Sequence, residues 1–209
     1  MARAFFPKDN RFLYSSAGNG DEKTHIYVMK PGVKPKELTP GKNVTAFFGG
    51  WNKNKTHFFI VSNDRDPKFF DVYRHDAKSY KRKRIFKNTF GVSPGTISPD
   101  EKWMTIEKTN SNADSDILIV NLTAKKPEPK LITPFDGQAN FKSLTFTADS
   151  KKLIYSTDSK GEFYEAWSYD LTTGKHTPYM KEDWNIMAMY LSYTGRYRVT
   201  SINADAKTK

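Results

Sequence analysis

Residues 98–109 read SPDEKWMTIEKT, a polar turn that leads into a strand-like run of aromatic and aliphatic residues. The same pattern stands at four other places: PKDNRFLYSS (7–16), NKNKTHFFIVSN (52–63), TADSKKLIYSTD (147–158) and SYTGRYRVTSIN (192–203). The turns align on Asp9, Asn54, Asp100, Asp149 and Thr194, at intervals of 45, 46, 49 and 45 residues. Self-similarity at such a period indicates a repeat architecture.

A second series of segments keeps the same step: HIYVMKPG (25–32), DVYRHDAK (71–78), DILIVNLT (116–123) and AWSYDLTTG (166–174). Some units close with a third element, ELTPGK (37–42) or LITPFDG (131–137). The strand-like segments are rich in Tyr, Phe, Ile, Val and Trp, and Asn, Asp and Pro mark the turns between them. Nowhere do apolar residues keep a 3.6-residue period over the length of an ordinary helix. The sequence therefore predicts an all-β fold of four-stranded units, which is typical of a β-propeller.

The repeat predicts about four and a half blades in one partial β-propeller domain, residues 1–209, with blades at 2–43, 44–92, 93–138, 139–186 and, in part, 187–209. The segment before each turn is expected to be the innermost strand, where Gly49, Gly50 and Gly95 suit a crowded axis. Open blade edges invite pairing with another chain. We expect an incomplete ring that is a fragment of a longer polypeptide and self-associates through these edges. A four-bladed ring with a ragged tail is the alternative.

Composition excludes several classes of protein. The 209 residues include no Cys, so a disulfide scaffold, a thiolate metal site and a cysteine nucleophile are excluded. No apolar run approaches the roughly 20 residues of a membrane span. The first residues, MARAFFPKDN, lack the features of a signal peptide. Lys and Arg exceed Asp and Glu by 11.

One segment matches the nucleophile elbow G-x-S-x-G of serine hydrolases, at residues 91–95. The residue after the nucleophile must donate its backbone N–H to the oxyanion, and Pro94 has none. A turn and a strand are expected after Ser93, where an elbow needs a helix. We therefore predict a blade-entry loop here and no catalytic residue in this chain.

Three further patterns have structural interpretations. Residues 112–116 resemble a calcium loop, but the required Gly and Glu positions hold Ile117 and Thr123, so a hairpin turn is favoured. The four His residues lack zinc-ligand spacing. We expect neither a metal nor another cofactor. The basic run at residues 81–84 is interpreted as a solvated loop on the rim of a blade, and no nucleic-acid partner is expected.

The repeats resemble the WD-like blades of the TolB type. The segments KELTPGKNVTAFFGGWNKNKTHFFIVSNDRDPKFFDVYRHDAKSY, SPDEKWMTIEKTNSNADSDILIVNLTAKKPEPKLITP and SKGEFYEAWSYDLTTGK further resemble the N-terminal propeller of the prolyl oligopeptidase family of serine peptidases, in its bacterial dipeptidyl- and acylaminoacyl-peptidase-like branch. The resemblance implies an α/β-hydrolase domain in the same parent polypeptide, which would carry Ser, Asp and His. It also implies a peptide substrate and a periplasmic or secreted parent.

Two functions follow from this resemblance. In the first, the chain is the non-catalytic propeller of a serine peptidase, which gates access and contributes to peptide binding. Asn63, Arg65 and Asn110 are then the candidate substrate contacts, because each follows the second strand of its blade. The alternative for residues 63–66 is a purely structural one, a local Asp–Arg pair that is exposed to water. In the second, the chain is a TolB-like scaffold that binds another protein, so whether it belongs to an enzyme stays open. A sugar-processing or nucleic-acid-binding propeller is a distant third.

Overall fold

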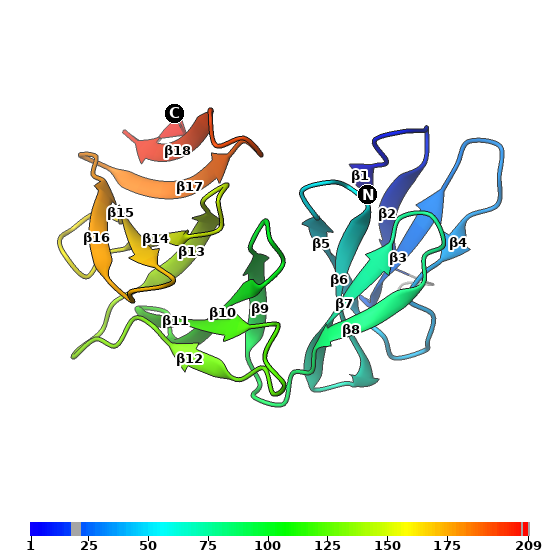
Figure 1. Cartoon of the computed structure of the whole chain (residues 1–209), viewed down its shortest axis with the longest axis horizontal. Coiled ribbons are helices and arrows are strands. Elements are labelled where there is room, and N and C mark those ends of the chain that lie inside the picture. The colour runs from blue at the N-terminus through cyan, green and yellow to red at the C-terminus, as the bar shows by residue number, and fades with distance from the viewer. Residues whose placement is uncertain (18–21, 206, 209) are drawn as a thin grey trace. The chain divides into compact units, whose positions relative to one another are not determined.

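The computed structural model describes residues 1–17, 22–205 and 207–208, and every regular element among them is a β-strand. The strands form five antiparallel sheets in which the order in the chain is also the order in space (Figure 1). Four of the sheets have four strands and the last has three. The all-β prediction and the propeller-blade prediction are therefore confirmed. None of the described residues belongs to an apolar helix of membrane-spanning length.

Two compact units make up the chain, Met1–Pro94 and Gly95–Lys209. The first unit holds two sheets: β1 (Ala2–Phe5), β2 (Phe12–Ala17), β3 (Thr24–Met29) and β4 (Lys36–Glu37), then β5 (Ala46–Trp51), β6 (His57–Asp66), β7 (Phe69–Asp76) and β8 (Arg82–Phe86). These two sheets pack on each other through buried Leu13 and Ile26 on one side and Phe58 and Ile60 on the other.

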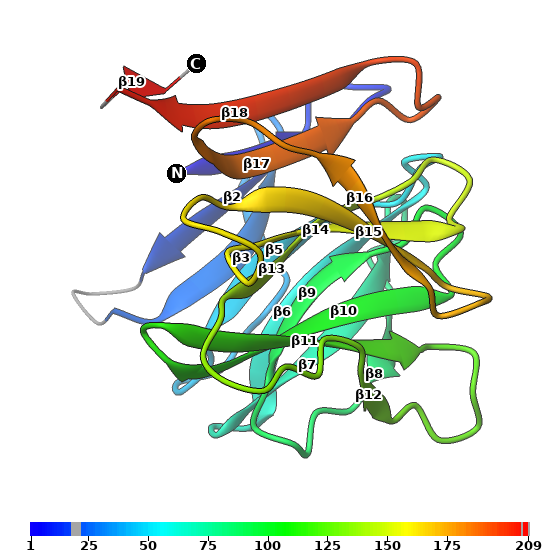
Figure 2. The same cartoon turned by 90° about the vertical axis from the view of Figure 1, so that its left-hand side faces the viewer.

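Three sheets belong to the second unit, although its first strand begins at Ser93, just before the division. They consist of β9 (Ser93–Ile97), β10 (Trp103–Ser111), β11 (Asp114–Asn121) and β12 (Pro129–Leu131); β13 (Phe141–Phe146), β14 (Lys152–Thr157), β15 (Glu165–Asp170) and β16 (His176–Met180); and β17 (Asn185–Leu191), β18 (Arg198–Ala204) and β19 (Lys207–Thr208). Figure 2 shows β13 to β16 following one another across their twisted sheet. Buried side chains from neighbouring sheets, such as Ile117 with Phe146 and Ile154 with Ile186, form the cores between them.

The turn between the first two strands has the same geometry in four of the sheets. Its first residue accepts a backbone hydrogen bond from the N–H three residues later, in the pairs Asn52–Lys55, Ser98–Glu101, Thr147–Ser150 and Ser192–Gly195, at 2.8–3.0 Å. The later residue of each pair has a positive φ, between 53° and 72°. A positive φ is uncommon for residues other than Gly, so its recurrence at one repeat position shows that the turn geometry belongs to the repeat.

The first residue of this turn also supplies a side-chain oxygen. Oδ1 of Asn52, Oγ of Ser98, Oγ1 of Thr147 and Oγ of Ser192 each accept the backbone N–H five residues later, at 3.0 Å. Short polar side chains commonly bond nearby backbone in turns. The repeated Asn, Ser or Thr at this position is thereby explained. In the first sheet Phe6 stands there instead, and only its backbone N–H bonds across the turn, to Arg11 at 2.9 Å.

The Leu-Thr-Pro-like segments after the fourth strands have a related function. Oγ1 of Thr39 accepts the N–H of Ile26, and Oγ1 of Thr133 accepts the N–H of Ile117, each at 2.9 Å. All four residues are buried. The threonine therefore continues the hydrogen bonding of the third strand where the short fourth strand has ended, which satisfies a buried backbone donor.

The three glycines predicted at a crowded axis differ in their surroundings. A Cβ on Gly95 would collide with Oγ1 of Thr105 and lie 3.4 Å from Oγ of Ser143, so a close approach does require glycine there. A Cβ on Gly49 would lie 3.3 Å from Cβ of Phe59. Gly50, by contrast, has open space around it and a φ of 109°, at an irregularity in the pairing of β5 with β6. At Gly50 the cause is the bulge and not crowding.

A neutral histidine lies in the core of the first unit. His75 is 1% exposed and stacks on Phe58 at 5.2 Å between ring centroids. Burial, with a smaller effect of the positive charge on Arg82, lowers the pKa of His75 to about 4. An unfolded chain would protonate this ring near pH 6.5. Unfolding therefore takes up a proton between these two pH values, and acid in this window destabilises the fold.

We expect the chain to lose about 2 kcal/mol of unfolding free energy between pH 7.5 and pH 5 because of His75. The His75→Phe variant keeps a ring against Phe58 and should lose most of this dependence in urea unfolding. A smaller slope should remain from His176, whose pKa burial also lowers. An unchanged slope in His75→Phe would contradict this assignment.

Candidate functional site

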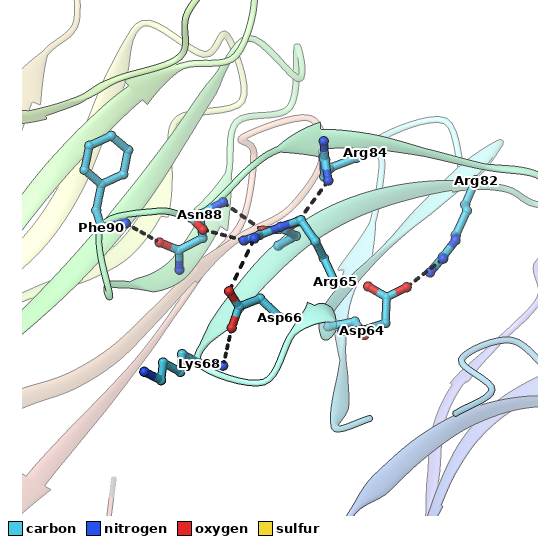
Figure 3. A network of polar contacts seen from close by, with 10 residues as sticks. Asp64, Arg65, Asp66, Lys68, Arg82, Arg84, Asn88 and Phe90 are labelled. Carbon is cyan, nitrogen blue, oxygen red and sulfur yellow. Dashed lines mark hydrogen bonds and ion pairs between the residues drawn. The ribbon is translucent and has the colours of Figure 1, made fainter. Parts of the chain in front are cut away.

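The β6–β7 end of the second sheet holds a polar network that includes Arg65, Arg84 and Asn88 (Figure 3). Asp71 has no exposed side-chain surface. Arg65 donates to it through both Nε (2.7 Å) and Nη2 (2.9 Å). The backbone N–H of Asn88 donates to Oδ1 at 2.8 Å, and Nη1 of Arg84 lies 3.4 Å from Oδ2. A two-pronged Arg–carboxylate pair of this kind fixes the orientation of both side chains.

Arg65 and Asn88 connect this pair to the segment that follows β8. Nη2 of Arg65 also donates to the carbonyl of Asn88 at 2.6 Å. The Asn88 amide donates to the carbonyl of Val92 and accepts the N–H of Phe90. The network thus fixes residues 88–92, which lead into the third sheet. The hydrogen bond to Asp71 raises the pKa of Arg65 above its ordinary value, so the guanidinium stays charged.

The local pair expected within residues 63–66 is not the main contact of Arg65. Nη1 of Arg65 lies 3.8 Å from Asp66, and Asp64 pairs with Arg82 at 2.6 Å. The pairing partner of Arg65, Asp71, comes from the next strand, and its carboxylate is hidden from water. A single Asp within the apolar run Phe69–Tyr73 is the sequence signal that could have indicated this partner.

The basic run at residues 81–84 also differs from its prediction. Arg82 and Arg84 belong to β8 itself, the fourth strand, and not to a loop before it. Alternate residues of a strand face the same side, so both guanidinium groups reach the acidic residues of the β6–β7 hairpin. Arg82 also lies over the ring of Tyr73 at 4.5 Å, and burial raises the pKa of that phenol to about 12.

The other predicted contacts are also held by intramolecular bonds. Asn63 is buried, and its amide accepts the N–H of Thr45 at 2.6 Å and donates to the carbonyl of Pro67 at 3.3 Å. Asn63 and Arg65 lie two residues apart near the end of β6. Asn110 belongs to the second unit, where its exposed side chain donates to Asp116 at 2.9 Å.

The motifs predicted to be structural lie in strands and turns. Ser93 is exposed at the start of β9, and Pro94 follows it within the strand. A two-residue hairpin turn joins β10 to β11, in agreement with the hairpin turn predicted within residues 112–116. Nδ1 of His176 lies 3.0 Å from the hydroxyl of Tyr155. Within residues 1–17, 22–205 and 207–208, no cluster of three or more His, Asp or Glu side chains is arranged to hold a metal ion.

Neither a protein-family model nor a curated protein matches the sequence. Among solved structures, TolB from Acinetobacter baumannii is 19% identical with a TM-score of 0.64, over 91% of this chain and 46% of TolB. A variant of prolyl oligopeptidase B from Galerina marginata, bound to a 35mer hydrolysis and macrocyclization substrate, is 12% identical with a TM-score of 0.68, over 100% of this chain and 32% of the other.

The fold is that of β-propeller blades. A Mycobacterium tuberculosis puromycin-hydrolyzing peptidase also matches, at 11% identity and a TM-score of 0.58, over 96% of this chain and 36% of the peptidase. The chain spans less than half the length of each of these three proteins. At these identities the likeness establishes the fold alone.

Loss of one partner of the Arg65–Asp71 pair should destabilise the first unit, because the other partner is left without its opposite charge. Replacing Asp71 by Asn keeps the shape but leaves the guanidinium without its charged partner, which should cost about 3 kcal/mol of unfolding free energy. The matched Asp66→Asn variant removes a half-exposed charge 3.8 Å from Arg65 and should cost under about 1 kcal/mol. Urea unfolding of both variants tests this, and equal losses would contradict the assignment.

Proposed function

We propose that the chain is the non-catalytic propeller portion of a prolyl-oligopeptidase-like serine peptidase. In this role it gates the access of peptides to an α/β-hydrolase domain of the same polypeptide and contributes to peptide binding. The main support is the likeness, over the whole chain, to about a third of a prolyl oligopeptidase that carries a bound 35mer substrate. A periplasmic or secreted location belongs to the same proposal.

The geometry around Ser93 supports a non-catalytic role. Pro94 provides no N–H for an oxyanion, and a strand follows Ser93 where an elbow would need a helix. The chemistry of acyl transfer would then come from the other domain. The blades would contribute the walls and the loops that a peptide meets on its way to it.

Within this proposal, Asn63, Arg65 and Asn110 are candidate contacts for the peptide. Arg65 has the strongest case, because it keeps a permanent charge and 22% of its side chain is exposed. Its contact with Asp71 fixes its orientation, so an ordered cation is available to a peptide carbonyl or carboxylate. Asn63 would affect peptide binding through its hydrogen bonds to Thr45 and Pro67, which position the chain there. Asn110 would contact the peptide through its exposed amide group.

A TolB-like scaffold that binds another protein is the second candidate. The likeness to TolB covers most of this chain at the highest identity among the three structures compared above. In this case the blades would do no chemistry, and no hydrolase domain would accompany them.

Labelling with a fluorophosphonate separates the two candidates. An antibody raised against the 209-residue chain would isolate the native polypeptide, which is then exposed to the probe. We expect a labelled polypeptide larger than the chain, while the isolated chain and its Ser93→Ala variant stay unlabelled. A native polypeptide that is never labelled would favour the scaffold, and labelling of the isolated chain at Ser93 would overturn the non-catalytic assignment.

The role of Arg65 is tested in the parent peptidase. We expect Arg65→Ala to raise KM for a peptide substrate several-fold with kcat little changed, because it removes a binding contact and no reacting group. Arg84→Ala is the matched control, since it also removes a cation beside Asp71. An equal change in KM for both variants would show that the effect acts through Asp71 and not through contact with the peptide.

A further inference from the structure

The net positive charge of the chain is carried entirely by its first unit. Residues 1–94 hold 19 Lys and Arg against 8 Asp and Glu, whereas residues 95–209 hold 15 of each. The net charge of +11 therefore belongs to the two sheets of the first unit. Such an asymmetry is a physical basis for attracting an anionic partner.

Most of this charge gathers at one end of the two sheets. Four hairpin-closing segments form this basic end: residues 6–11, 30–36, 52–56 and 76–81. All their residues are described, and they hold nine basic residues, Lys8, Arg11, Lys30, Lys34, Lys36, Lys53, Lys55, Lys78 and Lys81, against the two acids Asp9 and Asp76. Their closeness is shown by Nζ of Lys36, which lies 5.1 Å from the centre of the Tyr80 ring.

Both acidic side chains of the basic end already accept hydrogen bonds from neighbouring residues. Asp9 accepts two hydrogen bonds from the Arg11 side chain, each 2.8 Å long, and these lower its pKa. Asp76 accepts bonds within its own turn, from the backbone N–H groups of Lys78 and Ser79 and from the Ser79 hydroxyl, which lower its pKa as well. The lysines of the basic end therefore outnumber the carboxylates that could offset them.

The basic end encloses a hollow of about 480 Å³ between the two sheets. Phe6, Pro7 and Ala77 give it an apolar part. Its charged lining has four basic residues against two acidic ones: Lys8, Arg11, Lys55 and Lys78 against Asp9 and Asp76. This volume lies within the range of ordinary ligand pockets. The hollow therefore combines room for an apolar group with positive charge beside it.

Arg11 makes this hollow a preformed feature. Its guanidinium lies over the Phe6 ring at 4.1 Å and donates to the carbonyl of Ala77 at 3.1 Å. It also bonds the hydroxyl of Tyr80. These contacts tie the β1–β2 turn of the first sheet to the β7–β8 turn of the second, so a ligand need not order the lining.

We propose that the basic end binds an acidic polypeptide segment that places an apolar side chain in the hollow. A polypeptide fits better than a single-stranded nucleic acid, which needs exposed rings for its bases to stack on. Of the rings in the four segments, Phe6 is buried and Tyr80 lies close to both Arg11 and Lys36. This proposal goes beyond the peptidase proposal and does not depend on it.

The test measures fluorescence anisotropy of a labelled peptide, Asp-Asp-Glu-Phe-Glu-Asp, with the 209-residue chain. Binding should weaken about ten-fold or more when NaCl rises from about 0.05 to about 0.5 M, because salt screens the attraction. A peptide with Ser in place of Phe should bind several-fold more weakly, and one with amides in place of carboxylates should not bind measurably. Equal binding of all three peptides would overturn the proposal.

Charge-reversal variants locate the site. We expect the double variant Lys8→Glu, Lys78→Glu to weaken binding about ten-fold. The control, Lys42→Glu with Lys87→Glu, makes the same change of charge at exposed positions outside the basic end and should change binding less than about two-fold. An equal loss of peptide affinity in the two double variants would show that the net charge alone attracts the peptide, and it would overturn the assignment of the site to the basic end.

The hollow is tested by Asn54→Trp, which adds a large ring to an exposed turn residue that lines it. This variant should abolish the advantage of the Phe peptide over the Ser peptide while keeping the salt dependence. A thermal melt of each variant confirms that it is folded. If a variant does not fold, the salt series and the peptide series on the unmodified chain still test the proposal. Displacement of the peptide by single-stranded oligo-dT at lower concentration than by unlabelled peptide would overturn the choice of partner.

Discussion

The hydrogen bonds that close the turn between the first two strands of a sheet support the rest of this structure. In four sheets one Asn, Ser or Thr uses both its backbone and its side chain to hold the residue five positions later. This fixes which residues of the two strands face each other. Because side chains alternate along a strand, the register decides which of them reach the core. A slip of the second sheet by one residue would move Phe58 and Ile60, which are completely buried in the core of the first unit, to its opposite face.

Once the register is fixed, the buried faces of neighbouring sheets meet. Side chains such as Phe58 and Leu153 have no exposed surface, and they pack against the adjacent sheet of their own unit. The threonines after the fourth strands satisfy backbone donors that this packing hides from water. Hydrophobic burial can then stabilise the sheets without the cost of unpaired polar groups.

Charged side chains in the first unit serve two different purposes. Around Asp71 they pair with one buried carboxylate, and Asp71 and Arg65 hold the segment after β8 in one conformation. At the basic end they are mostly exposed lysines with few acidic neighbours. A buried pair is sensitive to the loss of either partner, whereas exposed charges mainly affect the attraction of distant partners. The two groups of residues are therefore separable by mutation.

The repeated turn, the segments rich in aromatic and aliphatic residues and the period near 45 residues suffice to predict the blades from the sequence, because each strand and turn depends on residues close together in the chain. Ser93 could be excluded as a nucleophile on the same ground, since the missing N–H belongs to the next residue. The partner of Arg65 could not be predicted in this way, nor could the position of Arg84 in the fourth strand. The hollow beside Lys8 and the gathering of lysines around it likewise arise only when turns from two sheets are brought together. Local hydrogen bonds and propensities determine the blades, while these contacts between distant residues depend on how strands and sheets pack, which is decided by tertiary structure alone.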